Sequence, residues 1–291
     1  MLSQTVPTIR DTPGASIKTL LKALKTFPYR AVHALDIVDP IERAEFGAIV
    51  RERGLWLDFC VSRALGNDTL SPASADPSNR RRAVDMVCEM IVRGVEQGAR
   101  YVSLSSGTGH RDARDRPDAI ERLTDSLAEI YATIRAAATP GSPELGLLIE
   151  PMDVELDKRG TLGYAPEAIE LVRALGAPDA DVRLICDTAH LSLNGETPDS
   201  IVHAAELVAT VHLCNCCVDP GNELFGDKHI RPGDPGVFDL EAFRRIIDGI
   251  EPVFAQSGSV IPVFIEYRNH GDPDEHLSYL AESFARVLVP R

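Results

Sequence analysis

The segment LGLLIEPM, residues 145–152, decides how the chain is interpreted, because it joins a short aliphatic strand to a carboxylate. Its aliphatic residues are typical of a strand that is buried on both faces of a sheet. The strand ends at Glu150, whose charge is costly beside apolar neighbours unless a partner compensates it. An amphipathic pattern typical of a helix, APEAIELVRALG, follows at residues 165–176.

This unit, a short aliphatic strand followed by an amphipathic helix, occurs eight times along the chain. Buried strands that alternate with helices imply a parallel sheet. The pattern therefore predicts an α/β fold, a single (β/α)8 TIM barrel that forms one domain over residues 1–291. A doubly wound sheet is the alternative, but no glycine-rich phosphate fingerprint follows an early strand. The strands are expected at residues 5–10, 29–38, 55–62, 100–107, 145–152, 182–190, 208–216 and 262–268, and the helices at 16–27, 41–54, 80–98, 118–138, 165–176, 198–207, 239–250 and 274–289.

Composition and charge indicate a soluble, cytoplasmic protein that binds neither membranes nor nucleic acids. Hydrophobic residues make up 44% and charged residues 25% of the 291 positions, as in ordinary globular proteins. No apolar run approaches the roughly 20 residues of a membrane helix, and the N-terminus lacks the features of a secretory signal. The formal charge of −14, without a basic tract to offset it, repels phosphate backbones.

The six cysteines show no spacing typical of a disulfide framework, so we expect reduced thiols. Three of them lie in the segment CNCC, residues 214–217, which could bind a soft metal. Because no second Cys/His cluster stands at zinc-finger spacing, packing at the end of a strand is the favoured interpretation of Cys214, Cys216 and Cys217.

Four consecutive predicted strands end in a side chain that can bind a metal ion. In a barrel of this kind the C-terminal ends of the strands form the functional face, so these side chains should converge. Three carboxylates brought that close repel one another unless a cation lies between them. We therefore expect one divalent ion, Mn²⁺ first, with Mg²⁺, Co²⁺ or Zn²⁺ as alternatives that the residues do not separate. The predicted ligands are Glu150, Asp187, His212 and Glu266.

Taken alone, each predicted ligand could instead be a salt-bridged or surface-facing strand end, and His212 could be a core histidine. His33, inside another predicted strand, is expected to be buried in the barrel.

Four further polar residues follow the strand ends and are predicted to bind the substrate. Two of them lie in the Gly/Pro-rich segment FGDKHIRPGDPG, residues 225–236, and loops of this kind often close on a ligand. Cationic donors beside an acidic metal cluster can hold an anionic or hydroxylated molecule. The alternative to substrate binding is that these residues lie in solvated turns or are ordinary exposed charges. The four residues are His190, His229, Arg231 and Lys158.

The motifs IEPMD, CDTAH, VHLCN, GDKHIRPG and FIEYR resemble those of the xylose isomerase-like TIM barrel superfamily, in its branch of sugar isomerases and epimerases. The resemblance is specific from Glu150 onward, whereas the N-terminal third matches only in its alternation of strands and helices. It implies the four metal ligands named above, substrate contacts from His190 and Arg231, and a homo-oligomer.

Type IV apurinic endonucleases are more distant members of the superfamily and carry extra histidines for a cluster of metals. Asp227 and His229 resemble part of that set, but the second to fourth predicted strands offer no clear histidine pair to complete it. A metal-dependent nuclease is therefore the least favoured activity.

The predicted chemistry is the removal of a proton next to a carbonyl of a small sugar or keto-sugar acid, through a metal-stabilised enediolate. Glu150 and Glu266 would flank the substrate as catalytic acid and base. The prediction is an isomerase or epimerase, and a lyase, either a dehydratase or a decarboxylase, is the alternative. Lys158, His229 and Arg231 would favour a carboxylated substrate and so support the lyase. A non-catalytic sugar-binding barrel is a further alternative.

Overall fold

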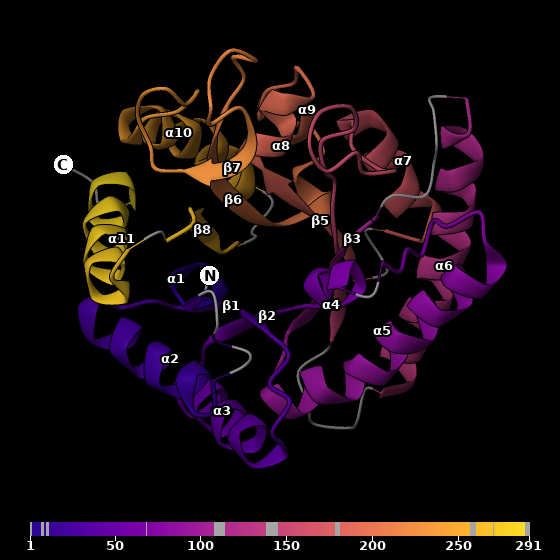
Figure 1. Ribbon diagram of the computed structural model, residues 1–291, viewed down its shortest axis with the longest axis horizontal. Coiled ribbons are helices and arrows are strands. Elements are labelled where there is room, and N and C mark those ends of the chain that lie inside the picture. Colours follow the sequence, from indigo (N-terminus) through magenta and orange to yellow (C-terminus); the bar gives the residue numbers. More distant parts are fainter. Residues whose placement is uncertain are drawn as a thin grey trace.

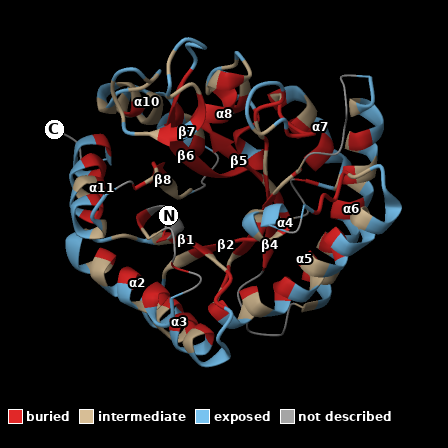
Figure 2. Cartoon of the chain, viewed as in Figure 1, coloured by how far each residue is buried: buried red, intermediate tan, exposed pale blue. Residues whose placement is uncertain are grey.

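A computed structural model shows a barrel of strands surrounded by helices (Figure 1). Buried residues line the strands and the inner faces of the helices, and exposed residues cover the outer faces (Figure 2). None of the described helices is long and apolar enough to cross a membrane. The structure describes residues 2–6, 9, 12–67, 69–107, 114–137, 145–177, 181–256, 260–269 and 271–288.

The described elements alternate between strand and helix along most of the chain. In order they are α1 (Leu2–Thr5), α2 (Ala15–Thr26), β1 (Ala31–Leu35), α3 (Pro40–Glu52), β2 (Trp56–Cys60), α4 (Ser62–Asn67), α5 (Pro77–Gln97), β3 (Tyr101–Ser105), α6 (Arg116–Ala137), β4 (Gly146–Glu150), α7 (Ala165–Ala174), β5 (Val182–Asp187), α8 (Thr188–Leu193), α9 (Asp199–Val202), a 3₁₀ helix (Ala205–Leu207), β6 (Val208–Cys217), β7 (Gly226–Ile230), α10 (Leu240–Gln256), β8 (Val263–Glu266) and α11 (Pro273–Leu288).

Strands β1 to β6 pair in sequence order and in parallel, and β8 pairs in parallel with β6. The predicted α/β barrel is therefore confirmed. Strand β7 is antiparallel to the end of β6, so it forms a hairpin above the barrel rather than one of its staves. Among the described residues β1 and β8 share no ladder.

The strand predicted at residues 5–10 is wrong for the part of that segment that the structure describes. Thr5 ends helix α1, and the N–H groups of Val6 and Ile9 donate to the carbonyls of Leu2 and Val6. Proline has no N–H to give to a ladder, and Pro7 interrupts the segment. Residues 7, 8 and 10 lie outside the described residues. The helix predicted at residues 198–207 is also shorter, because only α9 and a 3₁₀ turn form there.

Helix starts are set by acidic caps that lie directly before a proline. The Asp39 carboxylate accepts hydrogen bonds from the N–H groups of Ile41 and Glu42 at 2.9 and 2.8 Å, and Asp76 caps α5 in the same way. Both helices begin at a proline, which tolerates the first turn because its missing N–H would have no partner there. These helices return the chain to the sheet, so the carboxyl ends of the parallel strands face one side of the barrel.

A candidate metal centre at the carboxyl ends of the strands

The four predicted ligands converge around His212. Its Nδ1 atom lies 3.3 Å from Glu266, 3.6 Å from Glu150 and 3.9 Å from Asp187, measured to a carboxylate oxygen in each case. The register explains the convergence, since Asp187 is the partner of His212 across the β5–β6 ladder, and partners in a parallel ladder point to the same face.

The arrangement fits a divalent cation. Potential ligand atoms of Glu150, Asp187 and His212 all lie within 4.8 Å of one another. Asp187, His212 and Glu266 are buried, and only the side chain of Glu150 keeps 12% of its surface exposed. The Nδ1 atom of His212 is buried and has no hydrogen-bond partner among the described residues, although it faces three carboxylates. That these residues bind a metal stays a prediction.

Electrostatics at the site favour a positive charge. Burial lowers the pKa of His212, but the carboxylates of Glu150 and Glu266 outweigh it and raise this pKa to about 9. Burial raises the pKa of Asp187, although the neighbouring imidazoles of His190, His229 and His212 oppose the shift. A cation bound among the carboxylates would compensate their negative charge, as the extra proton on His212 does without it.

Asp187 is held in place through both of its oxygens. Oδ1 caps helix α8 by accepting from the N–H groups of Ala189 and His190 at 2.8 and 3.1 Å, and Oδ2 accepts from the Cys214 thiol at 2.9 Å. The interpretation of the CNCC cysteines as packed residues agrees with their burial, but the contact of Cys214 with a predicted ligand was missed. Side-chain alternation along β6 is the signal that could have found it, because His212 and Cys214 share a face.

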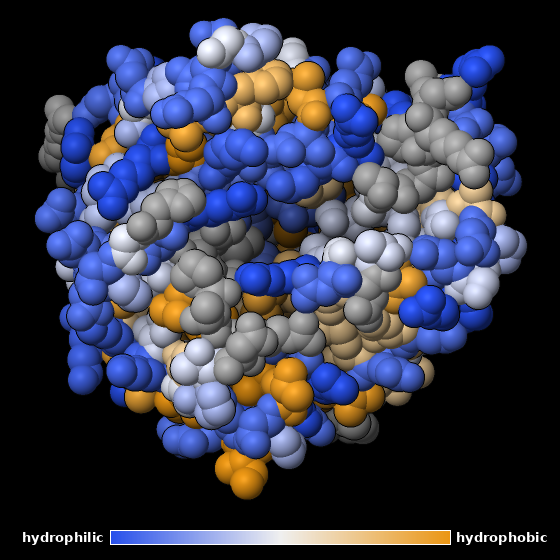
Figure 3. All heavy atoms as spheres, viewed as in Figure 1, coloured by the Kyte–Doolittle hydropathy of each residue, from blue (hydrophilic) through white to orange (hydrophobic). Residues whose placement is uncertain are grey.

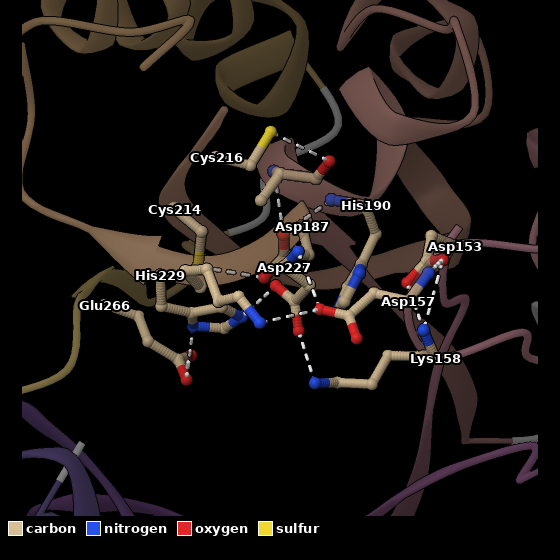
Figure 4. Close-up of polar contacts among 12 residues, drawn as sticks. Asp153, Asp157, Lys158, Asp187, His190, Cys214, Cys216, Asp227, His229 and Glu266 are labelled. Carbon is tan, nitrogen blue, oxygen red and sulfur yellow. Dashed lines mark hydrogen bonds and ion pairs between the residues drawn. The ribbon is translucent and has the colours of Figure 1, made fainter. Parts of the chain in front are cut away.

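A buried chain of polar contacts leads from Glu266 to the loop after β4 (Figure 4). His229 places Nδ1 3.1 Å from Glu266 and Nε2 2.6 Å from Asp227, whose other oxygen lies 2.8 Å from Lys158 Nζ. His229 has φ of 48°, a left-handed conformation that is unfavourable for a residue with a side chain. The hairpin β6–β7 holds this strained residue beside Glu266, which sequence reasoning did not show.

Asp153 organises the loop that carries Lys158. Its carboxylate is fully buried and accepts from the N–H groups of Leu156, Asp157 and Lys158 at distances between 2.6 and 3.2 Å. Asp157 in turn accepts from the N–H of Asp227 at 3.0 Å, so the loop after β4 is tied to β7.

The predicted substrate-binding residues divide into two groups. His190 and His229 are both buried, with ring centroids 6.0 Å apart, and His190 lies in helix α8 rather than in a loop. Lys158 pairs with Asp227 beside them. Arg231 is exposed instead, with its guanidinium over the rings of Tyr279 and Tyr267 at 4.8 and 5.6 Å. The face shown in Figure 3 is hollowed at its centre, with hydrophilic residues around the hollow.

The family model described as xylose isomerase-like TIM barrel matches residues 21–285, and the chain belongs to this family. The prediction of one domain over residues 1–291 extends beyond that match and stays a prediction. A search of curated proteins found no significant match.

Solved structures share the fold. A Sinorhizobium meliloti protein aligns with a TM-score of 0.73 and 22% sequence identity, over 98% of this chain and 96% of that chain. The IolI protein with a bound zinc atom aligns with a TM-score of 0.70 and 14% identity, over 98% and 96%. L-ribulose 3-epimerase aligns with a TM-score of 0.63 and 20% identity, over 96% and 84%.

Proposed function

We propose that this protein is a divalent-metal-dependent isomerase or epimerase that acts on a small sugar or keto-sugar acid. The observation that carries the proposal is the convergence of three carboxylates on His212 at the carboxyl ends of the strands. Two of the similar folds support it, since one is a sugar 3-epimerase and the other holds zinc.

Glu150, Asp187, His212 and Glu266 would hold the metal. Bound there, a divalent ion supplies a Lewis acid that polarises a substrate carbonyl and makes the neighbouring C–H more acidic. Three carboxylates and one imidazole suit Mn²⁺, and also Mg²⁺, Co²⁺ or Zn²⁺.

Glu150 and Glu266 are the candidates for proton transfer. They come from β4 and β8, on either side of His212, so a substrate between them would meet one carboxylate on each face. Their surroundings differ, because Glu150 is partly exposed while Glu266 contacts both His212 and His229. Burial raises the pKa of Glu266, but the two histidines outweigh it and hold this pKa well below its usual value. Glu266 would therefore be ionised at neutral pH, the form in which a carboxylate binds a metal ion and can accept a proton.

The residues beside the centre would orient the substrate. His190 and His229 present imidazoles toward the carboxylates, and Lys158 adds a cation at the edge of the same cluster. Together they could bind hydroxyl groups or a carboxylate on the carbons next to the reacting one. A carboxylated substrate would keep the dehydratase or decarboxylase reaction open, so the products must be identified.

Solvent deuterium exchange tests the proposal. The metal-loaded protein is incubated in D₂O with a panel of ketoses and keto acids, and the products are identified by NMR. We expect deuterium at the carbon next to the carbonyl of at least one compound, together with an epimer or isomer. Loss of water or carbon dioxide would identify a lyase instead. If no compound gains deuterium, proton-transfer catalysis is ruled out for that panel.

A further inference from the structure

A second cluster of ionisable side chains lies inside the barrel, next to the proposed metal centre and outside the chemistry described above. His33 in β1 and Asp58 in β2 are register partners on neighbouring strands, and they are 1% and 0% exposed. The ring of His33 lies edge-on to the ring of His212, with centroids 5.6 Å apart. Both residues therefore point into the barrel, toward the predicted ligand His212.

The polar atoms of this cluster are poorly satisfied. His33 Nδ1 lies 3.1 Å from Asp58 Oδ2, so the two side chains form a buried pair, but the contact does not meet hydrogen-bond geometry, and the described residues offer no partner of good geometry to His33 Nε2 or Asp58 Oδ1. The same holds for both ring nitrogens of His212. Buried polar groups normally have partners, and a water molecule or a bound ion can complete a group of this kind.

The geometry of the cluster suits a metal ion. Potential ligand atoms of His33, Asp58 and His212 all lie within 4.8 Å of one another. Two imidazoles and one carboxylate are a ligand set that binds transition metals and leaves a position open. Cys60 follows Asp58 by two residues, on the same face of β2, and offers a thiol nearby.

We propose that His33, Asp58 and His212 bind a second divalent transition-metal ion, and that the imidazole of His212 is shared between the two centres. Its Nδ1 atom faces the three carboxylates, which leaves Nε2 for the second ion. When both nitrogens coordinate, the N–H proton of the ring goes to solvent. The nitrogen-rich second centre favours Zn²⁺ or Co²⁺ over Mn²⁺ and Mg²⁺, whereas the carboxylate-rich first centre accepts any of the four.

A cavity adjoins the second centre at His33. It has a volume of about 360 Å³ and lies between α2, α11 and the strands β1 and β8, with His33 and Phe264 in its wall. The described parts of β1 and β8 form no ladder there, so the barrel wall can open more easily than where strands are hydrogen-bonded. The cavity therefore adjoins the cluster at His33, whereas Asp58 and His212 do not line it.

The proposal concerns metal binding and shares only His212 with the proposed enzyme site. Metal content therefore tests it without any assay of activity. The protein is stripped with a chelator, dialysed against Zn²⁺, and its zinc content is measured by elemental analysis. We expect about two ions per chain in the natural protein and about one in Asp58→Asn, which preserves the shape of the side chain. Ser103→Ala is the matched control, because Ser103 is a buried neighbour on β3, and it should keep both ions.

Two further measurements keep the outcome decisive if Asp58→Asn does not fold. The double variant Glu150→Gln, Glu266→Gln should retain about one ion, held at the second centre. The absorption spectrum of bound Co²⁺ should contain two components, one of which is absent in His33→Ala.

A single ion in the natural protein, lost in the double variant, would overturn the second centre and leave the proposed function intact. Two ions without any turnover would contradict the proposed function alone.

Discussion

His229 Nδ1 lies 3.1 Å from Glu266 Oε1, which links the β6–β7 hairpin to the predicted ligand at the end of β8. His229 was expected to bind substrate, and it also forms the middle of a chain that runs from Glu266 through Asp227 to Lys158. An imidazole fixed between two carboxylates limits the orientations of both. We infer that this chain sets the position of Glu266 in the reaction.

Weakening this chain should slow catalysis without unfolding the protein. We expect His229→Asn and Asp227→Asn each to lower kcat about 10- to 100-fold, the usual cost of removing a partner that orients a metal ligand. KM should change less in Asp227→Asn than in His229→Asn, because only the His229 imidazole is proposed to bind the substrate. Steady-state kinetics with the substrate found by deuterium exchange would measure this. Lys228→Gln is the control, since this exposed neighbour lies 4.0 Å from Asp157, outside the chain of contacts, and the variant should behave as the natural protein. A control that loses as much activity as the two variants would show that the loop, and not the chain of contacts, is being disturbed.

Removing either catalytic carboxylate should abolish turnover. In Glu150→Gln and Glu266→Gln an amide replaces the acid, so no proton can be taken up or returned, while the shape of the side chain is kept. Deuterium incorporation should fall to the background rate, and circular dichroism should show an unchanged fold. The exposed Glu155 in the loop after β4 gives the control Glu155→Gln, with normal exchange. Near-normal exchange in either variant would refute the acid/base role of that glutamate.

Metal binding should stabilise the fold. The carboxylates around His212 repel one another, and an ion that binds only the folded chain adds about 2.7 kcal/mol at a concentration 100 times its Kd. Thermal melts of the chelator-treated protein should therefore shift upward as Mn²⁺ is added. An equal shift in the Glu150→Gln, Glu266→Gln double variant would place the responsible ion elsewhere.

The stability of the metal-free protein should fall as pH rises from about 6.5 to 9. Folding raises the pKa of His212 from 6.5 to about 9, so the folded state holds a proton that the unfolded state releases. The stabilisation is complete below pH 6.5 and is lost as pH passes through the folded value. The pKa values of His33 and His229 are also raised, which acts in the same direction. Denaturant unfolding over this range measures the effect. Metal-loaded protein should show a weaker dependence, because an ion replaces the proton, and equal slopes with and without metal would contradict this account.

The sequence by itself determined the barrel and the set of predicted ligands. Short aliphatic strands alternate with amphipathic helices, and each of four strands carries its polar residue near the carboxyl end, so the parallel topology had to bring Glu150, Asp187, His212 and Glu266 to one side. The strand and helix patterns and the polar residue at each strand end are local features, because each is visible within a few residues of sequence.

Only the tertiary structure decided what these residues contact. The left-handed backbone of His229, the thiol of Cys214 against Asp187 and the pairing of His33 with Asp58 join segments that are far apart in the chain or depend on one hairpin. The first predicted strand was wrong because its first residue, Thr5, ends helix α1, and Pro7, which directly follows Val6, has no N–H to give to a ladder. Alternation along one strand shows which of its residues share a face, but the residues that they meet on other strands depend on the register, which is fixed when the sheet closes.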